Sequence, residues 1–117
     1  CVNVVPQVCN FNDIRGKKVK EDDRYVVKDN DSLNNLMLSS TRLKAGCSTN
    51  GHSHILQEEI YFFHSGEGFI QVDDENFDVK KGSVVLIPDG AFHKVTNTHG
   101  EEDLYFICVF DGNRYDG

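Results

Sequence analysis

Turn signals divide the chain from Leu33 onward into short apolar segments, none long enough for a typical amphipathic helix. Glycines and polar clusters separate these segments at intervals of about 8–12 residues, which is typical of β-sandwiches and β-barrels. The segment 83–87 is apolar throughout and is predicted to be a buried strand. The chain is therefore expected to be all-β, with strands at residues 36–43, 59–64, 69–72, 77–79, 83–87, 94–97 and 104–110.

Three histidines and one glutamate in two separate blocks have the spacing of a metal site. His52 and His54 are two residues apart, so a strand would direct both side chains to one face and toward one ion. Glu59 opens the next apolar segment and His93 precedes a later one, so each would reach the ion from a different strand. Imidazoles with one carboxylate suit a divalent first-row metal, and four protein ligands leave open positions on a five- or six-coordinate ion.

The residues around Glu59 have less certain roles from sequence alone. Tyr61 and Phe63 share its face of a regular strand and would point into the barrel. The Tyr61 hydroxyl could then act near the metal as an acid, a base or a substrate anchor, and the alternative is a core aromatic. Gln57 is expected to be a solvated loop residue, with contact to the metal or a ligand as the alternative, while Glu58 competes with Glu59 as the carboxylate ligand.

Both blocks resemble the two sequence motifs of the cupin superfamily. The first motif, G-x5-H-x-H-x3,4-E-x6-G, is matched by Gly46, His52, His54, Glu59 and Gly66. The second, G-x5-P-x-G-x2-H-x3-N, is matched by Gly82, Pro88, Gly90, His93 and Asn97. The six residues between Glu59 and Gly66 favour Glu59 over Glu58 as the ligand.

The resemblance implies a double-stranded β-helix, or jelly-roll, cupin barrel that binds one divalent transition metal (Zn, Fe, Mn or Ni). It implies His52, His54, Glu59 and His93 as metal ligands, with Tyr61 as the candidate catalytic residue. The first functional hypothesis is a metal-dependent isomerase-type enzyme acting on a small polar molecule such as a sugar or sugar phosphate. The alternatives are a mononuclear non-haem iron dioxygenase and a non-catalytic metal- or ligand-binding module.

The length of 117 residues predicts one domain, and the resemblance implies a small-molecule partner. Residues 1–32 are expected to form a lead-in with short β segments, and residues 33–117 the barrel. The net charge of −7 argues against nucleic acid and anionic membranes as partners. A homodimer is predicted, with residues 1–10 at the interface. The cysteines show no CxxC pair, which favours reduced thiols and a cytoplasmic location; they are Cys1, Cys9, Cys47 and Cys108.

Overall fold

The computed structural model describes residues 5–53 and 56–112, and these residues form nine β-strands and no helix. The strands are β1 (Lys17–Glu21), β2 (Tyr25–Asn30), β3 (Leu36–Leu43), β4 (Glu59–Ser65), β5 (Glu67–Val72), β6 (Glu75–Lys80), β7 (Val84–Ile87), β8 (His93–Asn97) and β9 (Leu104–Asp111). The strands predicted from residue 36 onward are all present, with ends that differ by no more than two residues.

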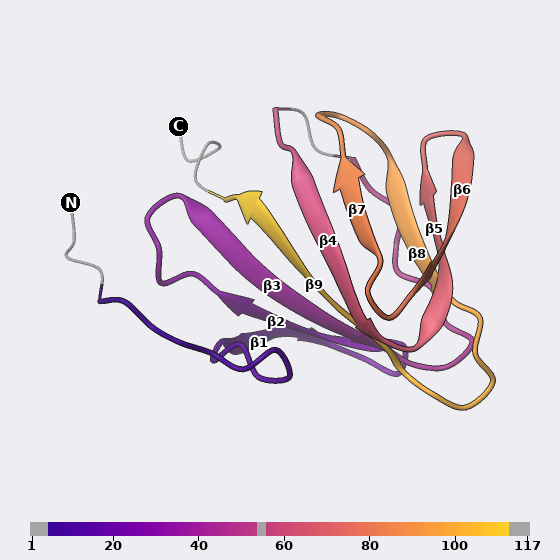
Figure 1. Ribbon diagram of the computed structural model, residues 1–117, viewed down its shortest axis with the longest axis horizontal. Helices are drawn as coiled ribbons and strands as arrows, with labels where there is room; N and C mark the ends of the chain where they lie inside the picture. The colour runs from indigo at the N-terminus through magenta and orange to yellow at the C-terminus, as the bar shows by residue number, and fades with distance from the viewer. Residues whose placement is uncertain (1–4, 54–55, 113–117) are drawn as a thin grey trace.

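Two antiparallel sheets face each other and enclose the interior of the protein (Figure 1). The larger sheet has the order β1-β2-β3-β9-β4-β7, and the smaller has the order β6-β5-β8. Strands distant in sequence are neighbours in the larger sheet, because β9 pairs with both β3 and β4. The predicted all-β, jelly-roll barrel is confirmed.

The core lies between the two sheets and follows from the alternation of side chains along each strand. Leu43, Ile70 and Leu104 are 0% exposed and come from β3, β5 and β9. In β4 the residues Glu59, Tyr61 and Phe63 are buried while those between them are not, as alternation predicts. Each fully buried aliphatic side chain contributes about 1.5–3 kcal/mol of transfer free energy to folding. The apolar core between the sheets therefore determines which residues of β4 point inward.

A strand is present in residues 83–87 as predicted, but the prediction that this strand is buried is wrong. The strand exists as β7, but Val84 is 56% exposed and Leu86 is 71% exposed, while Ile87 is buried. β7 forms the edge of the larger sheet and pairs only with β4, and its exposed residues alternate with the less exposed Val85 and Ile87. A short apolar run does not distinguish an edge strand from a central one.

Two strands of the larger sheet come from the predicted lead-in. β2 pairs with β3 along its whole length, and β1 pairs with β2. β1 was not predicted, because all five of its residues, Lys17–Glu21, are exposed and show no apolar alternation.

Cys9, Cys47 and Cys108 are free thiols in the described residues, and Cys1 lies outside them. No helix in residues 5–53 and 56–112 is long and apolar enough to span a membrane.

Candidate metal centre

Three of the four predicted metal ligands lie together, with Glu59 and His93 buried and His52 exposed. One ligand atom from each of His52, Glu59 and His93 lies within 4.8 Å of the other two. His93 Nε2 and Glu59 Oε2 are 3.0 Å apart, and both atoms are buried. Two imidazoles and a carboxylate so arranged form a donor set that fits a divalent transition metal. His54, the predicted fourth ligand, lies outside the described residues.

Backbone pairing brings the two histidine blocks together. The His52 N–H donates to the His93 carbonyl at 3.1 Å, and the His93 N–H donates to the His52 carbonyl at 2.9 Å. Two further bonds continue this ladder, from the Thr49 N–H to the Val95 carbonyl and from the Asn97 N–H to the Cys47 carbonyl, both 2.9 Å. Residues 47–52 therefore run antiparallel beside β8. His52 sits at an isolated bridge in this segment, whereas the sequence predicted a regular strand for it.

Local geometry on both sides of this pairing depends on glycine. Gly90 has a φ of 78° in the turn that the Ala91 N–H closes on the Pro88 carbonyl, and the left-handed region favours glycine. A Cβ on Gly51 would overlap the Phe92 ring in its present position, so a side chain beside His52 would require this ring to shift. These two positions let His52 and His93 lie side by side, with ring centroids 4.4 Å apart.

Glu59 enters the site as the first residue of β4. It pairs with Ile87 of β7 and Phe110 of β9, and it is 5% exposed, while Glu58 is exposed to solvent. Gln57, two residues before Glu59, is 6% exposed, and its Nε2 donates to the Asp111 carbonyl at 3.0 Å. The expectation of a solvated Gln57 is therefore wrong. Its amide anchors the end of the loop to β9, a long-range contact that no local pattern reveals.

The outward nitrogens of both imidazoles contact backbone carbonyls. His93 Nδ1 lies 3.1 Å from the Ala91 carbonyl oxygen, and His52 Nδ1 lies 3.3 Å from that of Asn50. A carbonyl can only accept, so Nδ1 is the donor in each contact and the lone pair of the neutral ring is on Nε2. Such bonds orient a metal-ligating histidine and fix its tautomer.

The electrostatics of His93 are dominated by its burial and by Glu59. Burial lowers the pKa of His93, but the hydrogen bonds to Glu59 and to the Ala91 carbonyl, with the carboxylate charge, raise it overall above its ordinary value. A divalent ion would compete with the proton of the His93 imidazole for binding to His93 and Glu59, since metal binding requires the unprotonated imidazole.

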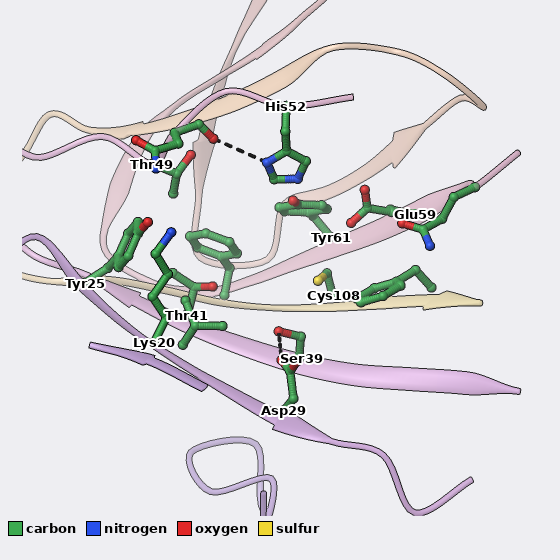
Figure 2. Close-up of a pocket in the computed structure, with 15 residues that line it drawn as sticks. Lys20, Tyr25, Asp29, Ser39, Thr41, Thr49, His52, Glu59, Tyr61 and Cys108 are labelled. Atoms are coloured by element: carbon green, nitrogen blue, oxygen red, sulfur yellow. Dashed lines mark hydrogen bonds between the residues drawn. The ribbon is translucent and has the colours of Figure 1, made fainter. Parts of the chain in front are cut away.

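The metal centre opens onto a cavity of about 390 Å³, which is within the range of about 300–1,000 Å³ for small-molecule sites. Figure 2 shows His52, Tyr61 and Glu59 on one side of this cavity and Ser39 and Asp29 on the other. Its apolar lining includes Phe106, Cys108 and Phe110 of β9, together with Tyr25 and Val27 of β2. The polar lining from the first three strands is Lys20, Asp29, Ser39 and Thr41.

Tyr61 lines the same cavity, and its ring centroid is 5.7 Å from that of His93. Burial, with smaller effects from Cys108 and Glu59, raises the pKa of Tyr61 well above its ordinary value. Burial likewise raises the pKa of the Cys108 thiol far above normal, so this thiol is a poor nucleophile. Tyr61 is therefore a protonated phenol that can donate a hydrogen bond into the cavity.

The sequence did not identify the wall of the cavity opposite the metal centre. Lys20, Asp29, Ser39 and Thr41 lie on β1, β2 and β3, and their common orientation depends on strand pairing that the sequence did not predict. The alternation of β3 allowed either set of its residues to face inward, so the chemistry of this wall became visible only in the structure.

The sequence model of the cupin domain matches residues 40–110, so the chain belongs to the cupin family. An uncharacterized protein of Methanocaldococcus jannaschii is 32% identical over 95 residues, covering 72% of this chain and 75% of the relative. The oxalate-binding protein of Thermotoga maritima is 32% identical over 73 residues, covering 62% of this chain and 60% of that protein. Among solved structures, KdgF from Halomonas sp. is similar in fold, with a TM-score of 0.76 and 17% identity over 94% of this chain and 98% of KdgF.

The two neighbouring glutamates provide a test of the metal centre. Glu59→Gln should lower affinity for a divalent ion by more than roughly a hundredfold, since disturbing a residue behind the ligands already costs about 10–100-fold. Glu58→Gln removes the same charge one residue away from an exposed position and should leave affinity nearly unchanged. Metal titration monitored by calorimetry measures both variants, and a larger loss in Glu58→Gln would contradict the assignment.

Proposed function

We propose that the protein binds a small carboxylate through a divalent metal held by His52, Glu59 and His93, with His54 as the fourth ligand. The observation that carries the proposal is the position of the His52, Glu59 and His93 cluster at one side of a cavity of small-molecule size. A bound divalent ion supplies positive charge and open coordination positions for ligand oxygens.

The surroundings of the metal centre suit a small acid. Tyr61 donates a hydrogen bond from its hydroxyl to a ligand oxygen, and Phe106 and Phe110 exclude water from that side of the cavity. The relative from Thermotoga maritima is named an oxalate-binding protein, which supports a carboxylate as the ligand class.

A sugar phosphate is supported less well. Arginine suits phosphate through its bidentate geometry, but the described residues that line the cavity include no arginine. Arg42 stacks on the Tyr105 ring at 4.5 Å, and its Nη1 lies 4.0 Å from Asp103 Oδ2. The isomerase and dioxygenase activities expected from the sequence therefore stay predictions.

Oxalate binding should depend on the metal. Metal-loaded protein should bind oxalate in a calorimetric titration, and protein stripped with a chelator should lose most of this affinity and regain it when the metal is restored. His93→Ala should behave like the stripped protein, because it removes one ligand. Equal oxalate affinity with and without metal would contradict the proposal, and the stripped wild-type protein keeps the test valid if the variant does not fold.

A second candidate function is catalysis with Tyr61 as the proton donor. The position of the phenol favours it, because Tyr61 lines the cavity and its ring lies beside that of His93. Tyr61 would donate that proton to a substrate oxygen and take it back in the reverse step.

Tyr61→Phe tests this candidate in a screen of small acids and sugar phosphates. The variant should keep the fold and the metal content, and turnover should fall by roughly 10²–10⁴-fold because the proton donor is lost. Unchanged turnover would make Tyr61 a core aromatic, in stacked contact with Phe63 and Phe106.

We also propose that the chain forms a homodimer in a reducing compartment such as the cytoplasm. Ile60 pairs with Leu86 and Phe62 with Val84, so these four residues form one apolar patch on the outward face of β4 and β7. Leu86 and Val84 are the most exposed of the four. An apolar patch of this kind favours covering by another protein surface.

The interface predicted for residues 1–10 falls partly outside the described residues. The free thiols support a reducing environment for the protein.

Light scattering tests the dimer. The particle should have twice the 13.2 kDa mass of the chain at micromolar concentration, and Leu86→Lys should shift it toward the monomer because the lysine charge would be buried. A wild-type particle of 13.2 kDa would contradict the proposal.

A further inference from the structure

A β-bulge turns Lys20 toward the cavity. Lys18 pairs with Lys28, but Lys20 pairs with Val27, and the register shifts between them. Paired residues in an antiparallel sheet share a face, and neighbours along a strand lie on opposite faces. Without the bulge, Lys18 and Lys20 would share one face. With it, Lys20 joins Val27 on the cavity side, and bulges often re-aim a side chain in this way next to a functional site.

Lys20 is the only cationic side chain among the described residues that line the cavity. The acidic ones are Glu59 and Asp29, and Asp29 accepts a hydrogen bond from Ser39 at 2.7 Å. Two carboxylates offset the formal charge of a divalent ion, so Lys20 supplies the excess positive charge of the loaded cavity. Within the described chain, no carboxylate lies at ion-pair distance from Lys20, whose Nζ is 5.3 Å from the centre of the Tyr25 ring.

Lys20 lies away from the metal centre along the strands. Its row in the sheet runs through Val27, Thr41 and Phe106 to Phe63. Phe63 is four residues beyond Glu59 on β4, which is about 13 Å along a strand. Figure 2 likewise shows Lys20 with Tyr25 and Thr41 at the end of the cavity remote from Glu59.

We propose that Lys20 determines the ligand specificity of the site by binding a second anionic group, so that the preferred ligand is a dianion longer than oxalate. This inference rests on the proposed function, since the first carboxylate binds at the metal. The hydroxyls of Ser39, Thr41 and Thr49 line the cavity between the two ends and can bond to polar groups along the ligand.

Calorimetry on metal-loaded protein tests the proposal with linear dicarboxylates of three to six carbons, each compared with the monocarboxylate of the same length. At the best-fitting length the wild-type protein should prefer the dicarboxylate by roughly tenfold or more, as expected for a hydrogen bond to a charged group. Lys20→Met should abolish this preference, because it lowers dicarboxylate affinity much more than monocarboxylate affinity and leaves metal content unchanged, and Lys20→Arg should retain it.

Lys18→Met is the matched control. It removes the same charge at a position two residues from Lys20. The Lys18 side chain is exposed and pairs with Glu21 at 3.2 Å. This variant should keep the dicarboxylate preference, which separates a direct contact from a change in overall charge.

The outcomes distinguish the two proposals. If oxalate and the monocarboxylates bind in a metal-dependent way but the preference is absent or survives in Lys20→Met, the role of Lys20 is overturned and the proposed function stands. If neutral polyols of the same length bind better than the dicarboxylates, the second anionic group is overturned. If metal-loaded wild-type protein binds no carboxylate, both proposals fail.

Discussion

The pair of backbone hydrogen bonds between His52 and His93 is the constraint on which the functional site depends. These residues are far apart in sequence, and their mutual N–H to carbonyl bonds hold residues 47–52 against β8. Glu59 is the first residue of β4, and the alternation along that strand directs its side chain inward, toward His93. Gly90 supports the approach through its left-handed backbone, and the absence of a side chain on Gly51 leaves room for the Phe92 ring.

Charge balance links the metal centre to the rest of the cavity. A buried carboxylate is costly unless it is paired, and the described partner of Glu59 is His93, itself buried. A divalent ion would stabilise the same arrangement by satisfying both side chains, and it would offset the negative charge of Asp29 across the cavity. A protein with a net charge of −7 needs such a local source of positive charge to bind an anion.

The sequence predicted the β-barrel well, because short apolar segments between turns leave few alternatives. It also predicted which residues would cluster, and His52, Glu59 and His93 do so. The sequence prediction failed where the structure depends on which strands or residues pair with one another. The lysine-rich β1 has no apolar alternation, the apolar β7 lies at an edge, and Gln57 is buried by one long-range bond. Lys20 faces the cavity only because a bulge shifts the register, and single-strand periodicity does not reveal a bulge.

X-ray absorption at the metal edge of loaded protein, recorded with and without oxalate, tests the central claim most directly. The account predicts a nitrogen and oxygen shell with the multiple-scattering signal of coordinated imidazoles, weakened in His93→Ala, and a change in the shell when oxalate binds. A spectrum without imidazole features, or one that oxalate leaves unchanged while it binds, would contradict a metal-mediated carboxylate site.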